Sequence, residues 1–599
     1  MTKSESAYAS RLAMLRAQMK LSRISAYLVP RQDEFQGEYV PAYAERLKWL
    51  TGFAGSWGMA IITLKDAAIF VDGRYTVQVR QQVDAKLFKP QHLIENPPAE
   101  WIEKNLKKGD RLGFDPWLTT VVDAEKFSLA CTRVKAAFVP VNANLIDHVW
   151  QDQPNRPTGS IAVQPQQFAG RSVADKLQQL AKELANSGAD AVVLSEPASV
   201  AWLLNIRGND IPFTPVVPAY AIIRRKGKSE VFIDPSKVPE DVSSHLKVHA
   251  TVRKRDTIGK SLAALAAKKS IVLLERSSTP DQIRNLLTKA KARIVYGADP
   301  CILPKAQKNA TEQEGARAAQ RRDGAAMVKF LHWLELEGQN GNLSEWTAAE
   351  KLHGFRKESD VLMDLSFGTI SATAGNAAIP HYHVEEATSL PLLLNSVYLI
   401  DSGGQYQDGT TDITRTLVMG QPTDEMKDRF TRVLKGMIQI SLLQFPQGTT
   451  GAHIDAFARA SLWKAGFDYD HGTGHGVGAY LSVHEGPARI SKTSHVELKP
   501  GMILSNEPGY YKEGEYGIRI ENLLLICKAS EPKGGDRKML SFETLTLCPI
   551  ERKLIESRLL TREELEWLDN YHARVWRELR PMVDGPTAKW LTKACSPIR

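Results

Sequence analysis

The feature that most constrains this chain is that several strongly apolar segments in its last third end in, or contain, a carboxylate. Residues 397–401 read VYLID, residues 502–509 read MILSNEPG and residues 516–526 read YGIRIENLLLI. Each segment has the composition of a buried β-strand. A buried charge without a partner costs free energy, so a fold that buries these strands must also supply partners for their acidic residues.

Two of the acidic residues are predicted to face each other across a hairpin. Asp401 ends the first apolar segment, residues 403–409 (GGQYQDG) contain turn signals, and residues 410–418 (TTDITRTLV) form the expected returning strand, which carries Asp412. Neighbouring strands lie ~4.8 Å apart, and paired metal ions lie roughly 3.5–4 Å apart. We therefore expect Asp412 to bridge two ions while Asp401 binds one of them.

Three further residues complete a predicted site for two metal ions. His475 lies in the glycine-rich segment 472–478 (GTGHGVG), where small neighbours let the backbone and a substrate approach closely. Glu507 ends the second apolar segment, and Glu521 shares one face of the third with Arg519. Four carboxylates balance two divalent cations, which avoids a net buried charge. Any one of these residues alone would more often be a solvated acid or a core histidine, but together they predict an enzyme that acts through an activated water.

The chain resembles a known family. Residues 306–545 are similar to the pita-bread metallopeptidase domain of methionine aminopeptidases, prolidases and aminopeptidase P, whose ligand order is Asp, Asp, His, Glu, Glu; the chain matches all five at the positions above. His381 in AIPHYH and His484 in VHEGP match two further landmarks of the family. A resemblance to the long, three-domain form of Xaa-Pro aminopeptidase extends upstream through residues 38–63, 70–78 and 202–223.

The resemblance implies both a fold and a reaction. The fold is α/β (α+β), with two creatinase-like N-terminal domains followed by a pita-bread catalytic domain. The reaction releases the N-terminal residue from peptides with proline in the second position, through a hydroxide that bridges two divalent metals. The bond before proline is a tertiary amide, so its cleavage needs a strong nucleophile. Glu507 would handle the proton of the water, and His381 and His484 would contact the substrate and stabilise the tetrahedral intermediate.

Four residues are candidates for supporting roles. Arg519 would orient a metal-bound carboxylate, and Tyr511 is a similar supporting candidate. His471 lies at the mouth of the glycine-rich segment, where its role is either catalytic or structural. Arg74, in the run DGRY that ends a predicted strand, would reach the bound peptide or form a surface salt bridge. Because oxygen donors outnumber the single nitrogen, manganese is favoured over zinc, with cobalt or zinc as substitutes in vitro.

Linker composition and an internal repeat divide the chain. Proline, glycine and glutamine gather at residues 152–170, and a second seam falls near residues 300–307. The motifs WLTGFAG, AIIT and IFVDGRY recur in the same order as WLLNIRG, AIIRR and VFIDPSK, which indicates two copies of one mixed α/β domain. We expect creatinase-like domains at residues 1–155 and 160–303, the catalytic domain at residues 306–545 and its C-terminal extension at residues 546–599.

A helix is predicted in the C-terminal extension, over residues 561–579. It opens with a capping box from Thr561 to Glu564, and it either packs on its own domain or contributes to a dimer interface. The densest basic run of the chain, residues 224–228 (RRKGK), is interpreted as a hairpin turn rather than a phosphate-binding patch.

Composition narrows the remaining functions. The net charge of +9 over 599 residues is mild and favours no nucleic-acid partner. Five scattered cysteines without a CxxC pair argue against a disulfide framework and against a thiolate zinc site. The N-terminus lacks the apolar region of a signal peptide, and no run of 18 apolar residues occurs. We therefore expect a cytoplasmic enzyme that binds neither membranes nor nucleic acid. We also expect a homodimer, and the resemblance implies peptide substrates.

Two other functions stay open on the sequence. A prolidase, which cleaves Xaa-Pro dipeptides, uses the same five ligands but usually has one N-terminal domain. A non-enzymatic binding module keeps the pita-bread fold and loses metal ligands, so the complete ligand set argues against it. A nucleotide-binding loop is disfavoured because GTGHGVG lacks the GxGxxG spacing.

Overall fold

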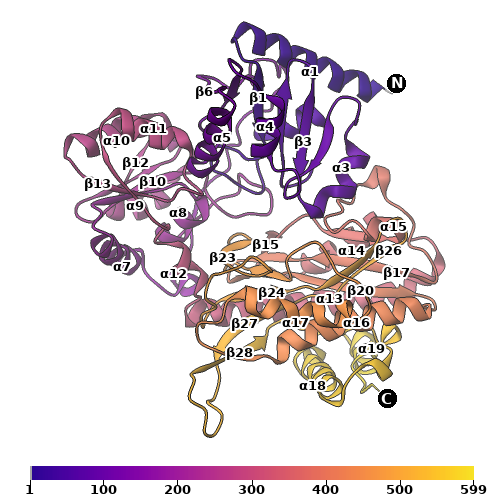
Figure 1. Cartoon of the computed structure of the whole chain (residues 1–599). Helices are drawn as coiled ribbons and strands as arrows, with labels where there is room; N and C mark the ends of the chain where they lie inside the picture. Colours follow the sequence, from indigo (N-terminus) through magenta and orange to yellow (C-terminus); the bar gives the residue numbers. More distant parts are fainter. Residues whose placement is uncertain (1–2, 599) are drawn as a thin grey trace. The chain divides into compact units, whose positions relative to one another are not determined.

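The computed structural model describes residues 3–598, which fold into two compact units. The first unit comprises the chain up to Pro165 together with Arg171–Cys301, and the second comprises Gln166–Gly170 together with the chain from Ile302 onward. Figure 1 shows the first unit in indigo to magenta and the second mainly in rose to yellow. None of the helices among the described residues has the length and apolar character needed to cross a membrane.

The first unit contains two six-stranded sheets that share one topology. The strands of the first sheet are Ala26–Pro30 (β1), Met59–Thr63 (β2), Ala67–Val71 (β3), Lys89–His92 (β4), Arg111–Phe114 (β5) and Ala137–Pro140 (β6). Those of the second are Ala191–Leu194 (β8), Tyr220–Arg224 (β10), Ser229–Phe232 (β11), Ala250–Arg253 (β12), Ile271–Leu274 (β13) and Arg293–Tyr296 (β14). The strand orders are β4-β3-β2-β1-β5-β6 and β12-β11-β10-β8-β13-β14. Strand β1 of the first sheet and strand β8 of the second occupy equivalent positions. Each pairs antiparallel with one neighbour and parallel with the other.

Helices cover these sheets. In β1, Tyr27 and Val29 pack into one core and Ala26 and Leu28 into another, because successive side chains of a strand point to opposite faces. The helices of the first domain are Lys3–Leu21 (α1), Arg46–Thr51 (α2), Thr76–Gln82 (α3), Pro98–Asn105 (α4) and Val121–Arg133 (α5). Those of the second are Val173–Asn186 (α7), Pro197–Leu204 (α8), Glu240–His249 (α9), Ile258–Ala267 (α10) and Asp281–Lys289 (α11).

The predicted internal repeat is confirmed by these elements. The three repeated motifs fall on α2 and α8, on β2 and β10, and on β3 and β11. After β3 and after β11, an aspartate caps a short 3-10 helix: Asp72 accepts a hydrogen bond from the Arg74 amide and Asp234 from the Ser236 amide, both at 3.0 Å. The basic run at residues 224–228 is the turn between the antiparallel strands β10 and β11, as expected.

The second unit is built on four sheets. A three-stranded sheet contains Ile370–Thr373 (β16), Ser396–Ser402 (β17) and Ile413–Met419 (β20), in that order. A six-stranded sheet contains Gln444–Pro446 (β21), Gly474–Gly476 (β22), Glu485–Ile490 (β23), Ile503–Asn506 (β24), Asn522–Lys528 (β27) and Met539–Thr544 (β28). Its order is β21-β28-β27-β24-β22-β23. The smaller sheets consist of Leu362–Leu365 (β15), Gly404–Tyr406 (β18) and Gly409–Thr410 (β19), and of Gly509–Lys512 (β25) and Tyr516–Arg519 (β26).

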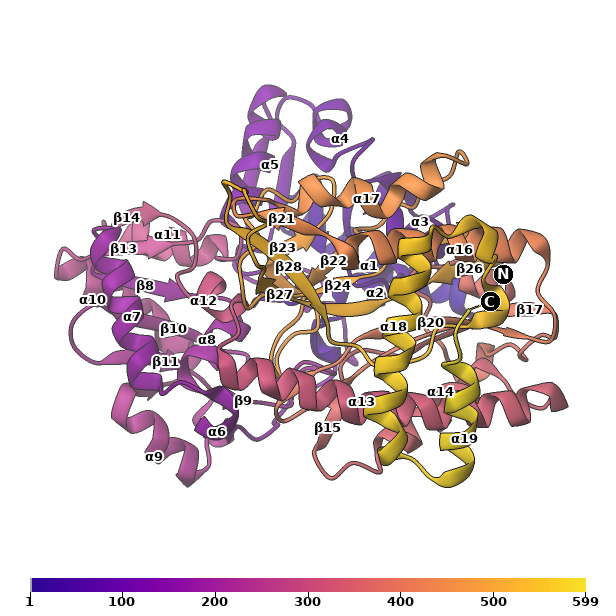
Figure 2. The same ribbon diagram turned by 90° about the horizontal axis from the view of Figure 1, so that it is seen from below.

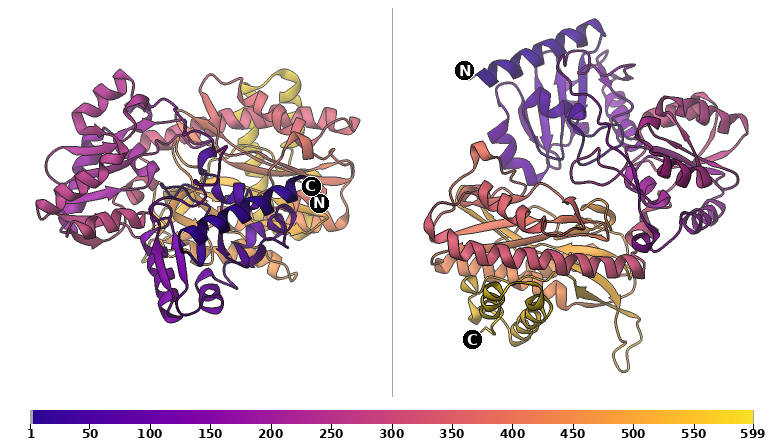
Figure 3. Two further views of the ribbon diagram at one scale, coloured as in Figure 1. Left: turned by 90° about the horizontal axis from the view of Figure 1, so that it is seen from above. Right: turned by 180° about the vertical axis from the view of Figure 1, so that it is seen from behind.

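Long helices pack on these sheets, and Figure 2 and Figure 3 show them from further directions. They are Ala310–Glu337 (α13), Glu345–Arg356 (α14), Asp424–Leu442 (α16), Gly451–Trp463 (α17), Arg562–Leu579 (α18) and Gly585–Ala594 (α19), with the shorter Ile302–Ala306 (α12) and Ala374–Ala377 (α15). The predicted capping box of α18 is present, since Thr561 accepts from the Glu564 amide at 3.2 Å. Because Leu568, Val575 and Leu579 are buried in the core of this unit, α18 packs on its own domain.

Two strand predictions in this unit were wrong in detail. The segment 516–526 is not one strand, because the chain leaves the sheet of β26 at Arg519 and enters the six-stranded sheet as β27 at Asn522. Glu521 lies in the crossing between the two sheets, where its amide donates to the Thr414 carbonyl at 3.1 Å.

The predicted hairpin is also more elaborate than expected. The returning strand β20 begins at Ile413 rather than at Thr410, because residues 404–410 fold back on themselves as β18 and β19 in another sheet. Asp401 is therefore opposite Thr414, and Asp412 immediately precedes the strand. The two aspartates still lie at the same end of the β17–β20 pair. Asp401 is the second-last residue of β17, and Asp412 immediately precedes β20.

Candidate metal centre

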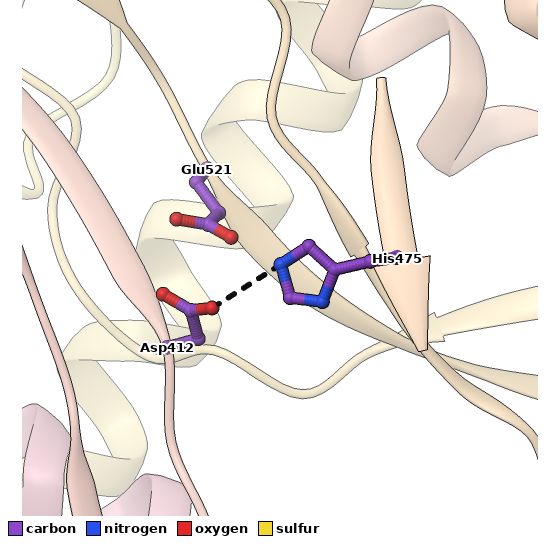
Figure 4. A group of neighbouring side chains, drawn as sticks. All are labelled: Asp412, His475 and Glu521. Carbon is purple, nitrogen blue, oxygen red and sulfur yellow. Dashed lines mark ion pairs between the residues drawn. The ribbon is translucent and has the colours of Figure 1, made fainter. Parts of the chain in front are cut away.

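Three of the five predicted ligands form one cluster. Asp412, His475 and Glu521 each present a ligand atom, and these atoms lie within 4.8 Å of one another (Figure 4). The Nε2 atom of His475 is 3.5 Å from Oδ2 of Asp412 and 3.4 Å from Oε1 of Glu507. The fifth residue, Asp401, is connected to the cluster by hydrogen bonds that run through Arg519 and Thr414 to Glu521. The structure thus gathers side chains from two sheets around a common centre.

The tautomer of His475 is set by the backbone carbonyl of the next residue, Gly476. Its Nδ1 atom is 2.9 Å from the Gly476 carbonyl oxygen, which can only accept, so Nδ1 carries the hydrogen. The lone pair of Nε2 then points at the carboxylates. Ser505 holds two groups of the site at once: its hydroxyl accepts from the His475 amide at 2.9 Å and donates to Glu507 at 3.0 Å. A histidine fixed in this way is ready to bind a metal ion.

Arg519 binds the carboxylate of Asp401. Its guanidinium donates from Nη2 to Oδ2 of Asp401 at 2.6 Å and from Nη1 to the Tyr511 hydroxyl at 2.8 Å. The Tyr511 hydroxyl is 2.8 Å from Nε2 of His471, whose Nδ1 faces the Gly472 carbonyl at 2.7 Å. The three supporting residues expected from the sequence therefore form one continuous chain of hydrogen bonds that ends on a predicted ligand.

Thr414 and Ser505 belong to the site but were not predicted. The Thr414 hydroxyl donates to Oε2 of Glu521 at 2.8 Å and accepts from Nε of Arg519 at 3.3 Å. Thr414 lies two residues beyond Asp412, and Ser505 lies two residues before Glu507. Residues two apart on a strand share a face, and that spacing is the signal that would have found both.

Burial makes the cluster electrostatically unfavourable unless cations are present. Burial raises the pKa of Asp401 to about 6, against the opposing charge of Arg519. Burial raises the pKa of Asp412 to about 7, although His484 and Arg519 act in the other direction. The pKa of Glu521 is raised well above its ordinary value, first by burial and then by the neighbouring carboxylates. Four acidic groups in one buried site therefore repel one another.

Two oxygen atoms in the site lack partners and point to what would bind there. Oδ1 of Asp401 and Oε1 of Glu521 are buried and have no hydrogen-bond partner among the described residues. Buried polar atoms are almost always paired, so these two atoms mark positions where a ligand is expected. Orphaned carboxylate oxygens, a histidine whose Nε2 faces oxygens of Asp412 and Glu507, and four converging negative charges fit divalent cations.

The glycines around His475 are required by the packing of the strands. A Cβ atom on Gly474 would lie 2.0 Å from the Ser505 carbonyl oxygen, and one on Gly476 would lie 2.2 Å from that of Glu485. Both distances are impossible for real side chains, so only glycine lets β22 pass between its neighbours. This close backbone approach is what the glycine-rich segment predicted.

The two histidine landmarks lie in different surroundings. The His484 ring packs edge-on against the His475 ring, with centroids 4.3 Å apart, and so lies beside the cluster. Its neighbour Glu485 is buried between two equally buried lysines, Lys305 and Lys308. His381 is half-buried in the segment that follows α15. Arg74 lies in the other compact unit and forms an ion pair with Asp72 at 2.8 Å.

Comparisons with families of known proteins match nearly the whole chain. The model of metallopeptidase family M24 matches residues 314–528, and that of the C-terminal region of this peptidase family matches residues 538–598. Two models of the creatinase/prolidase N-terminal domain match residues 11–149 and residues 152–312. The two copies of the repeated α/β domain therefore each match a creatinase-type domain.

Individual proteins agree over the full length. A probable Xaa-Pro aminopeptidase P of Laccaria bicolor is 41% identical over 98% of this chain and 93% of its own length. One from Coccidioides posadasii is 40% identical over 98% of this chain and 99% of its own. The crystal structure of X-prolyl aminopeptidase from Caenorhabditis elegans, described as a cytosolic enzyme with a di-nuclear active site, has a TM-score of 0.94 and 34% identity over 99% of this chain and 100% of that one.

Proposed function

The chain belongs to metallopeptidase family M24, among the Xaa-Pro aminopeptidases with two creatinase-type N-terminal domains, and from this we propose that it removes the first residue from peptides with proline in the second position. The observation that carries the proposal is the full-length similarity to aminopeptidases P combined with the buried cluster of carboxylates around His475. The family and the α/β fold expected from the sequence are confirmed.

Five residues would hold two divalent ions, namely Asp401, Asp412, His475, Glu507 and Glu521. When bound, two such ions supply an activated water and polarise the scissile carbonyl. The orphaned oxygens of Asp401 and Glu521 support this assignment. Asp412, whose Oδ2 faces His475 at 3.5 Å and which lies next to Asp401 in the hairpin, is the expected bridging ligand.

The remaining side chains would orient the reacting groups. Burial raises the pKa of Glu507, which favours the uptake of a proton from the attacking water. Arg519 fixes the angle of the Asp401 carboxylate, and Tyr511 together with His471 holds Arg519 in place. His484, next to the His475 ring, and His381 would contact the peptide and stabilise the oxyanion that develops in the transition state.

We propose manganese as the metal, because four oxygen donors and one nitrogen donor suit a hard cation. We also propose a cytoplasmic location, since the Caenorhabditis elegans enzyme is described as cytosolic. A homodimer is supported by two large aromatic side chains on α17, Phe457 and Trp463, which are 45% and 46% exposed. Light scattering of wild-type protein and of Trp463→Lys would test the dimer. The domain limits that we propose are residues 1–155, 160–303, 306–545 and 546–599.

Substrate length decides between this activity and the dipeptidase alternative. The Bacillus anthracis Xaa-Pro dipeptidase shares the fold but aligns with only 63% of this chain while 99% of its own is covered, so it lacks the equivalent of a large part of this chain. Xaa-Pro-Xaa tripeptides and longer Xaa-Pro peptides should be cleaved, peptides without proline second should be spared, and Xaa-Pro dipeptides should be poor substrates. Faster cleavage of dipeptides than of tripeptides in parallel assays would favour the prolidase function instead.

A further inference from the structure

One buried carboxylate organises the segment 373–390, which follows β16. Glu345, the first residue of α14, is 0% exposed. Its Oε1 accepts from the Thr373 amide at 2.8 Å, and its Oε2 accepts from the Tyr382 hydroxyl and from the Leu390 amide, both at 3.0 Å. These donors stand at the beginning, the middle and the end of the segment. A single side chain therefore holds the beginning, the middle and the end of this segment together.

Further hydrogen bonds reinforce this closure. The Asn376 side-chain amide lies 3.1 Å from both carboxylate oxygens of Glu345. Glu345 and Leu390 are bonded in both directions: the Glu345 amide donates to the Leu390 carbonyl at 3.0 Å, and the Leu390 amide donates to the Glu345 side chain. The Glu345 carbonyl accepts from the Ser371 hydroxyl at 2.5 Å. The start of α14 is thus the anchor for both ends of the segment.

Among the residues that the structure describes, the carboxylate achieves this without a cationic donor. Its four donors are two backbone amides, a side-chain amide and a phenol. Removing a carboxylate from water is unfavourable, and here hydrogen bonds and the N-terminal end of α14 offset that cost. A neutral side chain would fill the same space at a lower cost, so the acceptor capacity of Glu345 is what the site requires.

The anchored segment contains a strained residue. Ala374 has a φ of +48°, a left-handed conformation that is unfavourable for a residue other than glycine. It stands directly after Thr373, whose amide Glu345 holds, and before Asn376. Strain of this kind persists only where the surroundings fix the backbone, and it gathers at functional sites.

The loop that Glu345 anchors is the one that carries His381. His381 directly precedes Tyr382, the central donor to the carboxylate, so this hydrogen bond holds the residue next to His381. Within the described part of the chain, none of the hydrogen bonds of the Glu345 carboxylate reaches the five proposed metal ligands. We propose that Glu345 is a positioning residue that presents His381 to the substrate. This proposal rests on the proposed function, in which His381 contacts the peptide.

Replacement of the carboxylate by an amide tests the proposal. Glu345→Gln keeps the size of the side chain but turns one acceptor into a donor that faces other donors. We expect kcat/KM for an Xaa-Pro-Xaa tripeptide to fall about 10-fold to 100-fold, as is typical for the loss of a supporting hydrogen bond, while the metal content stays at the wild-type value. Glu350→Gln, an exposed residue of the same helix, is the matched control and should behave as wild type. Wild-type kinetics for Glu345→Gln, or loss of metal, would overturn the proposal.

A double variant separates positioning from a general structural role. If Glu345 acts through His381, adding Glu345→Gln to His381→Ala should change kcat/KM by less than about 2-fold, because the two effects are coupled. A further 10-fold or greater loss would contradict it. Tyr382→Phe removes one donor only, and it should reproduce a weaker form of the same pattern if Glu345→Gln does not fold; wild-type kinetics for Tyr382→Phe would then count against the proposal.

Hydrogen exchange gives a readout that does not depend on catalysis. In Glu345→Gln the amides of residues 373–390 should exchange faster than in wild type, while those of β17 and β20 should not change. Unchanged protection of residues 373–390 would sink the proposal. A wild-type protein without Xaa-Pro cleavage, but with this exchange difference between the variants, would reject the proposed function and leave the anchoring of the loop intact.

Discussion

Arg519 occupies one oxygen of Asp401 and leaves the other free for a ligand. Its Nη2 lies 2.6 Å from Oδ2 of Asp401, whereas Oδ1 is buried without a hydrogen-bond partner among the described residues. A planar guanidinium fixes the orientation of the carboxylate that it contacts. The pair therefore sets the direction in which Asp401 faces the other carboxylates, and it has consequences that can be measured.

Replacement of Arg519 should weaken metal binding at neutral pH. The pKa of Asp401, about 6, is raised by burial and lowered by Arg519, so Arg519→Met should raise it further and make the ionised form harder to reach. We expect metal affinity at pH 7 to fall about 10-fold to 100-fold. Metal titration followed by calorimetry checks this. Arg562→Met, whose side chain is 93% exposed, is the control, and equal affinities for the two variants would contradict the role of the pair.

The stabilisation by metal should grow with pH. The pKa values of Asp401 and Asp412 are raised from 3.8 to about 6 and about 7 in the metal-free folded protein. Between about pH 4 and about pH 7 the folded state therefore binds more protons than the unfolded state. The stability of the metal-free protein falls as the pH rises through this range. Metal ions need the ionised groups and bind more weakly as the pH falls. The difference in Tm between metal-loaded and metal-free protein should be larger at pH 8 than at pH 5. A larger difference at pH 5 would contradict the assignment of Asp401 and Asp412 as metal ligands.

Removal of a shared ligand should empty the whole site. We expect wild-type protein to contain two divalent ions per chain and to be most active with manganese. Asp412→Ala and Glu521→Ala should lose both ions, because each carboxylate would contact the shared centre. Elemental analysis of purified protein measures this. An active preparation with one ion or none would show that the centre is not dinuclear.

The two histidines outside the ligand set should affect turnover and not metal content. His381→Ala and His484→Ala should each lower kcat by about 10²-fold, a typical loss for a group that stabilises the transition state. Both variants should retain two ions per chain. Steady-state kinetics and elemental analysis on the same preparations decide this, and if both variants lost metal the histidines would have to be counted as ligands.

Arg74 tests whether the first domain contributes to substrate binding. Arg74 is paired with Asp72, and the two side chains are 27% and 19% exposed. If Arg74 also reaches the peptide, Arg74→Ala should raise KM for longer peptides and leave tripeptides unaffected. Arg80→Ala on α3 is the control. Unchanged kinetics at every peptide length would leave Arg74 with the salt bridge alone.

The sequence predicted the members of the site better than the path of the chain through it. Asp412 and Glu521 each lie next to a buried strand and His475 lies in a glycine-rich strand, and these properties can be recognised from the local sequence. The break at Glu521 was missed because the residues on both sides are apolar and alternate in the same way, although they belong to different sheets. The supporting role of Glu345 was equally invisible, since its partners lie 28 to 45 positions away and nothing in the local sequence of α14 marks it.

The break in the strand before Glu521 also gives the metal ions a mechanical role. Asp401 and Asp412 come from the three-stranded sheet and its hairpin, whereas His475, Glu507 and Glu521 come from the six-stranded sheet or its borders. Two ions held by all five residues would be cross-links between the halves of the second unit, comparable to a staple that joins distant segments. Removal of the ions by a chelator would then stop catalysis and would also break these cross-links between the two sheets.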